Sequence, residues 1–424
     1  MDILLKARAL LKNDTIRNGT FFSLFSFINK GINFLLLLIL ANFITPAEYG
    51  YLNLFNTIVM VIGYFIAMSS EGYLSVSYFS EGKDSVIQCV SCTLLTTSIV
   101  AVLFLLSILL KGSLISNFLN LPQQLLYLAV FTCFFSVFFR MAMNYFRIQK
   151  KVYAYGIISC GNAILYFIAS ILLIKYMQLS WEGCVFSQFG SNLIFGLFAL
   201  GLFLYKKFIS IPSVKYWKKM LFWGLPLIPH LATIFIRQGC DRYIINHFHG
   251  INEVGLFSFA LNLTNIIIMI GMSFNDSNSV ELFEILGNKD INNEKKKNLL
   301  QKQKRYIFKI YLFSSLIILT FGFFLTPIVL PKYEASVNYF AILTLYGFFH
   351  CLYFLYTNFL FYFKKNKILM YFTFFSAILH LALSLALTKY SLFATCFIYC
   401  FSQLIVVFFV RNYAKKLLER ELYL

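Results

Sequence analysis

Three basic residues stand inside long, mainly apolar segments of this sequence: Lys30, Arg140 and Arg237. A charge at the centre of a bilayer costs roughly 2.5 to 3.5 kcal/mol on an insertion scale, so a charged group there is expected to face a water-filled cavity or a partner. Lys and Arg are the usual partners of phosphate oxygens. We therefore predict that these three side chains line a central cavity and bind the anionic head group of a substrate.

Four further ionisable residues share this apolar setting and are candidates to bind a coupling ion: Glu71, Asp241, Asp276 and His230. Such groups inside membrane segments commonly belong to ion or proton pathways. The alternative is that the charges satisfy one another locally. Arg237 would then pair with Asp241, one helical turn away. Lys30 would pair with Glu71.

The composition identifies the environment in which these residues must be held. Of the 424 residues, 60% are hydrophobic and only 12% are charged, whereas soluble domains carry about 25% charged residues. The apolar segments run roughly 20 to 30 residues without alternation, which predicts helices and not barrel strands. The composition excludes a soluble enzyme and predicts an all-α, polytopic membrane protein.

Apolar length predicts twelve transmembrane helices. Their approximate ranges are 18–44, 51–79, 85–110, 122–146, 152–175, 180–205, 217–246, 253–283, 306–330, 335–363, 367–388 and 390–411. Apart from Lys30, Arg140 and Arg237, almost all Lys and Arg residues lie in connections or at span ends on one side of the membrane. Those on the other side are Lys111, Lys175, Arg242, Lys332 and Lys389. Because cytoplasmic loops carry the basic excess, both termini are predicted to be cytoplasmic. Topology therefore accounts for the net charge of +19 without a nucleic-acid partner.

The two halves of the chain are weakly similar to each other. At an offset of 205 residues, Glu48-Tyr49-Gly50 aligns with Glu253-Val254-Gly255. Six spans per half predict parallel repeats, related by an axis along the membrane normal, that enclose a cavity open to each side in turn. The predicted domains are an amphipathic cytoplasmic segment (1–17), two pseudo-symmetric six-helix lobes (18–209 and 210–411) and a cytoplasmic tail (412–424).

Three motifs carry a family resemblance. They are Thr45-Pro46-Ala47-Glu48-Tyr49-Gly50, Gly224-Leu225-Pro226-Leu227-Ile228-Pro229, and Asp241-Arg242-Tyr243 followed by Glu253-Val254-Gly255-Leu256-Phe257. With these motifs, its length and its span count, the sequence resembles polysaccharide flippases of the O-antigen (Wzx) type. These form the polysaccharide-exporter branch of the MATE-like (MOP) transporter superfamily.

The resemblance implies a MATE-like fold and a function in O-antigen lipopolysaccharide biosynthesis or a similar pathway. The implied substrate is an undecaprenyl-pyrophosphate-linked oligosaccharide, which moves from the cytoplasmic to the periplasmic leaflet of a bacterial inner membrane by alternating access. A proton or sodium gradient would drive this transport, as in an antiporter, and no cofactor is implied. A polysaccharide polymerase and a chain-length regulator are the implied protein partners.

Two other classes of function stay open. A multidrug exporter of the same fold needs an acidic cavity for cationic drugs, and the six clearest intramembrane charges divide evenly between basic and acidic. A membrane glycan polymerase places catalytic groups on a large outward loop, whereas the predicted outward loops are short. We expect neither catalytic residues nor a metal site, because the Cys89–Cys92 pair has no second pair and no adjacent His. His350 and His380 are interpreted as packing residues.

Overall fold

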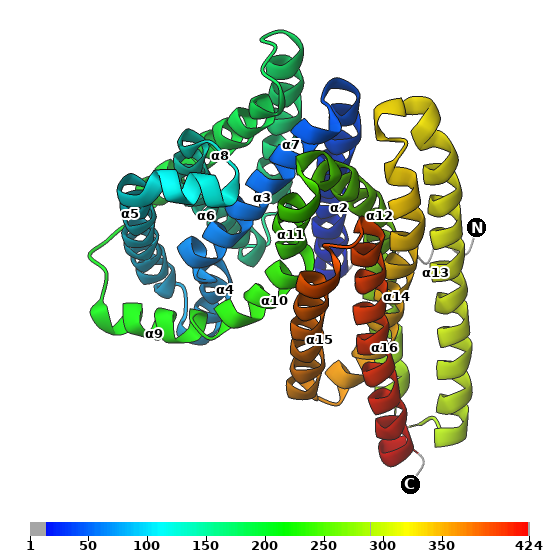
Figure 1. Cartoon of the computed structure of the whole chain (residues 1–424). Coiled ribbons are helices and arrows are strands. Elements are labelled where there is room, and N and C mark those ends of the chain that lie inside the picture. Colours follow the sequence, from blue (N-terminus) through cyan, green and yellow to red (C-terminus); the bar gives the residue numbers. More distant parts are fainter. Residues whose placement is uncertain (1–13, 289, 423–424) are drawn as a thin grey trace, which may run out of the picture. The chain divides into compact units, whose positions relative to one another are not determined.

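The structure is a computed structural model that describes residues 14–288 and 290–422 (Figure 1). The side chains at 14–20, 229–230, 276–277 and 422 lie outside this description, as do residues 1–13 of the predicted amphipathic segment. Helices make up the regular structure of the described ranges, which contain no strand. Of these helices, 11 are long and apolar enough to cross a membrane. The predicted all-α, multi-pass fold class is confirmed.

The chain divides into two compact units. Unit 1 contains the chain up to Ile44 and Tyr51–Ala232, and unit 2 contains Thr45–Gly50 and the chain from Thr233 onward. The two six-helix lobes, which rest on the sequence repeat, stay a prediction.

Unit 1 is a bundle in which α6 and α7 pack against α8, and α2 packs against α7. Its helices are α2 (Asp14–Phe43), α3 (Pro46–Ala67, from Tyr51 onward), α4 (Ser70–Glu81), α5 (Ser85–Leu119), α6 (Gln123–Ile148), α7 (Val152–Lys175), α8 (Trp181–Tyr205) and α9 (Val214–Gly224). The next helix, α10 (Leu227–Gln238), begins in unit 1 and ends in unit 2.

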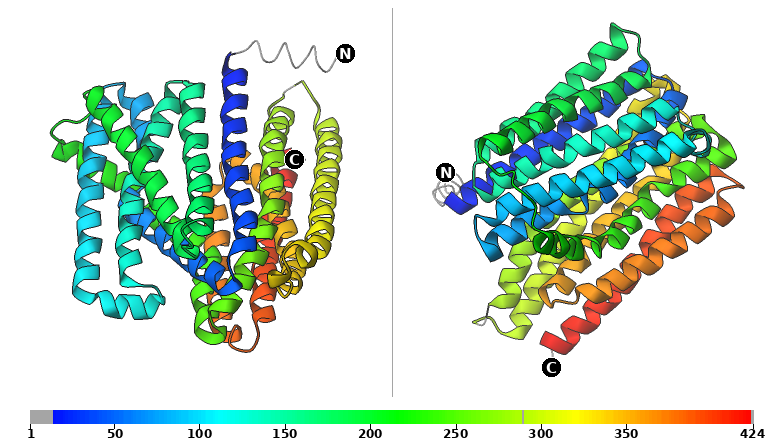
Figure 2. Two further views of the ribbon diagram at one scale, coloured as in Figure 1. Left: turned by 90° about the horizontal axis from the view of Figure 1, so that it is seen from above. Right: turned by 90° about the vertical axis from the view of Figure 1, so that its left-hand side faces the viewer.

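Unit 2 is organised around α14, which packs against α12, α13 and α16, while α15 packs against α16 (Figure 2). Its helices are α11 (Cys240–His249), α12 (Ile251–Gly287), α13 (Asn293–Val329), the short 3-10 helix η1 (Pro331–Tyr333), α14 (Ser336–Tyr362), α15 (Asn366–Leu387) and α16 (Leu392–Leu422). An apolar core of Leu282, Phe359, Leu360, Val406 and Val410 joins α12, α14 and α16.

Two of the predicted spans are broken. In the second span, α3 ends at Ala67 and α4 begins at Ser70, because Met68 and Ser69 adopt left-handed φ angles of 42° and 56°. The seventh span, predicted as one helix over 217–246, is instead α9, α10 and α11. Pro226 lies at its first break and Gly239 at its second. The prediction of one continuous seventh helix was wrong, because proline cannot donate the backbone hydrogen bond that continues a helix. The twelve-span count is roughly consistent with eleven long helices and this broken segment.

The Thr45–Gly50 motif is a helix start that belongs to unit 2. Thr45 donates to the Glu48 carboxylate from its backbone N–H at 2.6 Å and from Oγ1 at 2.9 Å, and the Glu48 N–H donates to Thr45 Oγ1 at 3.3 Å. This reciprocal pattern is a capping box, and Pro46 occupies the first helical position, where no N–H is needed. Tyr49 is fully buried, and its ring lies 5.9 Å from Phe259 between centroids.

The glycines of the two aligned Glu-x-Gly motifs let two backbones touch. A Cβ on Gly50 would lie 2.4 Å from the Ile251 carbonyl oxygen, and a Cβ on Gly255 would lie 1.7 Å from that of Pro46. No side chain fits at either position unless the first turns of α3 and α12 move apart. The motif therefore fixes the start of α3 inside unit 2 by close backbone contact.

We expect Gly255→Ala to destabilise the protein, because forced overpacking of this kind costs about 1–3 kcal/mol. In detergent, the apparent Tm followed by size-exclusion chromatography after heating should fall by several degrees. Gly201→Ala in α8 is the matched control, since nothing lies within 4 Å of the added Cβ and alanine favours helices over glycine. An equal Tm for the two variants would refute the close contact.

Candidate functional site

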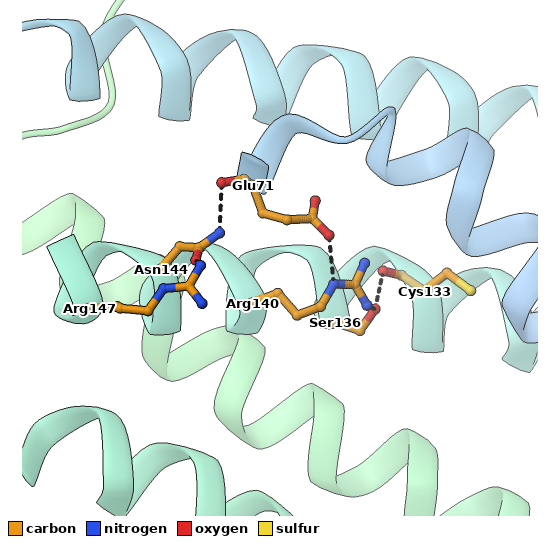
Figure 3. A network of polar contacts seen from close by, with 6 residues as sticks. All are labelled: Glu71, Cys133, Ser136, Arg140, Asn144 and Arg147. Atoms are coloured by element: carbon orange, nitrogen blue, oxygen red, sulfur yellow. Dashed lines mark hydrogen bonds and ion pairs between the residues drawn. The ribbon is translucent and has the colours of Figure 1, made fainter. Parts of the chain in front are cut away.

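In unit 1 the structure brings together two of the predicted site residues (Figure 3). Arg140 Nε on α6 donates to Glu71 Oε1 on α4 at 3.0 Å, and Arg140 Nη1 donates to Ser136 Oγ at 3.1 Å. The side chains of Arg140 and Glu71 are 36% and 24% exposed. An ion pair this open is partly screened by solvent and contributes less to stability than a buried one.

A polar face of α6 holds Glu71 in place. Ser136, Arg140, Asn144 and Arg147 are spaced three or four residues apart, so they lie along one side of the helix. Asn144 Nδ2 donates to the backbone carbonyl of Glu71 at 2.7 Å, and Arg147 donates to Asn144 Oδ1. The α6 helix therefore contacts Glu71 through both its carboxylate and its backbone carbonyl.

In unit 2 Asp241 pairs with His380, so the interpretation of His380 as only a packing residue is wrong. Asp241 Oδ2 on α11 lies 2.7 Å from His380 Nε2 on α15, and both side chains are 1% exposed. His380 Nδ1 lies 3.0 Å from Ser402 Oγ on α16, and the Tyr399 ring meets the imidazole edge-on at 4.9 Å. The signal for His380 was available in the sequence, because an ionisable group within an apolar span needs a polar partner.

The hydrogen-bonded series Asp241, His380 and Ser402 is compatible with two arrangements of the protons. With neutral imidazole, Nε2–H donates to the carboxylate and Ser402 donates its hydroxyl proton to Nδ1. With imidazolium, Nδ1–H donates to Ser402, whose hydroxyl then donates to the Tyr399 carbonyl, 3.2 Å away. The same atoms therefore satisfy both protonation states of His380.

Glu71 and Asp241 share two further features. Each lies in the first turn of a helix that follows a break in its span, α4 and α11 respectively, and a helix N-terminus favours negative charge. Each also keeps one buried carboxylate oxygen, Oε2 of Glu71 and Oδ1 of Asp241, without a hydrogen-bond partner within the described residues. That oxygen can accept a proton or a cation.

The remaining predicted residues are placed differently. Arg237 is half-buried and donates to Oε1 of Gln403, which is fully buried on α16. Lys30 is exposed on α2, and no ion pair joins it to another described residue. Within the ranges that the structure describes, neither local pair considered from sequence, Lys30 with Glu71 or Arg237 with Asp241, is formed. Glu71 contacts Arg140, Asp241 contacts His380, and Arg237 contacts Gln403.

Other predicted ligands are outside the description or form no cluster. The side chains of His230 and Asp276 lie outside the described residues. In the part of the chain that is described, no group of His, Cys, Asp and Glu residues is arranged to hold a metal ion.

Comparison with known proteins places the fold. A multidrug resistance MATE family transporter of the MOP superfamily, in an inward-facing conformation, is similar with a TM-score of 0.74 and 13% identity over 92% of this chain and 95% of that one. The lipid II flippase MurJ, in an inward closed conformation, is similar with a TM-score of 0.71 and 15% identity over 93% of this chain and 87% of that one. At these identities the similarity establishes the fold alone, which is MATE-like as predicted.

Sequence comparison identifies the family. A protein of the Lsg locus of Haemophilus influenzae is 26% identical over 377 residues, which cover 85% of this chain and 88% of that protein. Residues 15–277 match the family described as polysaccharide biosynthesis protein. This match confirms the resemblance that the three motifs indicated. Because it covers more than half of the sequence, the chain belongs to the polysaccharide biosynthesis protein family.

Proposed function

We propose that this protein is a flippase for a lipid-linked oligosaccharide, with undecaprenyl pyrophosphate as the lipid carrier and an O-antigen or similar repeat unit as the cargo. It would act by alternating access in a bacterial inner membrane with both termini in the cytoplasm. A polymerase and a chain-length regulator would act on the translocated units. Family membership supports the pathway, and the intramembrane charges support the chemistry of the substrate.

The observation that carries the proposal is the exposure of Lys30. This residue lies near the middle of Phe21–Phe43, an apolar segment of 23 residues. The adjacent Asn29 faces α7, where its Nδ2 donates to the Ser159 carbonyl at 2.6 Å. Lys30 follows about 100° further around the helix and is exposed. An exposed ammonium at this depth requires water or an anion beside it. A pyrophosphate group crossing the membrane would be such an anion.

We expect Lys30→Ala and Arg237→Ala each to lower the flipping rate about tenfold or more, because a hydrogen bond to a charged group contributes roughly 1.5–3 kcal/mol. The measurement is leaflet exchange of a fluorescent undecaprenyl-pyrophosphate-linked sugar in proteoliposomes that contain equal amounts of protein. Lys30→Arg should retain activity, and Lys175→Ala, at the end of α7, is the matched control. Normal transport by both alanine variants would remove the proposal, and uptake of a cationic dye in place of the lipid would favour a multidrug exporter.

For coupling, we propose that Asp241 with His380, and Glu71, take up the driving ion. Asp241→Asn should make transport independent of an imposed proton or sodium gradient, since the amide cannot ionise, while Asp241→Glu should keep the dependence. Glu334→Gln, an exposed acid outside the long helices, serves as the control. Full gradient dependence in Asp241→Asn would contradict the assignment.

Arg140 has two candidate roles, as an anion-binding residue and as the partner of Glu71. Reversing the pair with Glu71→Arg and Arg140→Glu separates them. A purely structural role predicts that the double variant recovers the apparent Tm that each single variant loses, together with transport. We expect recovery of Tm without recovery of transport, because the reversal removes the positive charge of Arg140 from α6 and the carboxylate of Glu71 from α4, where the anion and the coupling ion would bind. Recovery of both would make the pair structural only.

A further inference from the structure

A basic pocket of about 520 Å³ opens at one end of unit 2, between α13, α14 and α16. Its basic lining residues are Lys297 and Lys304 on α13 and Arg411 and Lys415 on α16. Neither the predicted transport site nor the coupling residues use it. In Figure 1 this is the end at which α16 finishes and α13 begins.

The floor of the pocket is apolar. Leu300, Phe359 and Ala414 line it, and all three are buried in the apolar core of α12, α14 and α16, to which α13 contributes Leu300. Tyr356 adds an aromatic wall, with the Lys304 ammonium 4.8 Å from its ring centroid. The pocket therefore combines an apolar base with a cationic rim.

Positive charge dominates that rim. Its one acidic residue, Glu419, lies 3.7 Å from Lys415 on the same face of α16 and offsets that residue's charge. The charges of Lys304 and Arg411 remain in excess. A ligand for this pocket must carry negative charge.

The positions of these residues along their helices set the depth of the pocket. In α13, no Lys, Arg, Asp or Glu occurs from Ile310 to Val329, whereas the half from Asn293 to Lys309 is strongly basic. At 1.5 Å per residue, the apolar half is about 30 Å long, which matches the hydrocarbon core of a bilayer. In α16, Arg411 is the first charged residue after the apolar stretch that starts at Leu392. Arg411 thus lies at the apolar boundary of α16, and Lys304 lies six residues, about 9 Å, before the apolar half of α13. This end of the pocket is near the level of lipid head groups.

We propose that this pocket binds the phosphate head group of an anionic lipid. The cationic rim takes the phosphate, and the apolar floor takes the first carbons of the chains, as in basic pockets between transmembrane helices that hold anionic lipids. Free phosphate would leave the apolar floor uncovered. The lipid can be a membrane phospholipid or the pyrophosphate-linked carrier, which share this chemistry. The site does not depend on the proposed transport.

The test is lipid binding by the full-length protein, measured by native mass spectrometry during titration. The probes are phosphatidylglycerol, undecaprenyl pyrophosphate, phosphatidylcholine and inorganic phosphate. The double variant Lys304→Gln with Arg411→Gln should weaken anionic-lipid binding about 25-fold, since each cation near a head group contributes roughly fivefold. Lys302→Gln with Lys416→Gln is the matched control, because it removes the same charge from exposed positions on the same two helices outside the pocket.

The probe that loses affinity identifies the ligand. Selective loss of phosphatidylglycerol assigns the pocket to membrane phospholipid, and selective loss of undecaprenyl pyrophosphate assigns it to the carrier. Equal losses in the double variant and the control would overturn the proposal, as would equal affinity for phosphatidylcholine or binding of inorganic phosphate alone. The flipping rate is measured separately, so failure of this site and failure of the proposed function are distinguishable.

Discussion

A charged or polar side chain in a hydrocarbon environment must find a partner, a cavity or water, and this constraint organises the interior of both units. Arg140 meets Glu71, Asp241 meets His380, and Arg237 meets Gln403. Each contact joins helices that are distant in sequence and belong to the same unit. The polar residues of an otherwise apolar chain therefore specify which helix faces meet, while apolar packing supplies the bulk of the stability.

Two acidic residues in apolar surroundings, Glu71 and Asp241, lie next to breaks in the helices. The break after α3 places Glu71, and the break after α10 places Asp241, in the first turn of a new helix. There the helix dipole stabilises a carboxylate, and the freed backbone groups add local polarity. In membrane transporters such interruptions are associated with substrate and ion sites. The half-satisfied carboxylates of Glu71 and Asp241 agree with that association.

Basic residues serve three different purposes in this chain. Most lie outside the apolar segments, at helix ends and in connections, and their uneven distribution is the basis of the predicted orientation with a basic cytoplasmic side. A few, such as Arg140 and Arg237, have partners within the apolar helices. A third set, Lys297, Lys304, Arg411 and Lys415, gathers where α13 and α16 pass from apolar to basic sequence. The topological and ligand-binding roles proposed for the first and third sets, and the ion pairs and hydrogen bonds of the second, thus follow from the depth and the neighbours of each residue.

The sequence alone determined the fold class, the family and the identity of the unusual residues, because apolar length, charge distribution and short motifs are local properties of the chain. The capping box at Thr45 and Glu48 is likewise local. Partners were not determined, since Arg140 and His380 contact residues on other helices, and no periodicity encodes which helices pack together. The breaks at Met68 and Gly239 also escaped prediction, because an apolar run looks continuous even where tertiary packing supports left-handed or interrupted backbone. Tertiary structure therefore decided how the charges are paired, and it alone brought two basic helix ends together around one pocket.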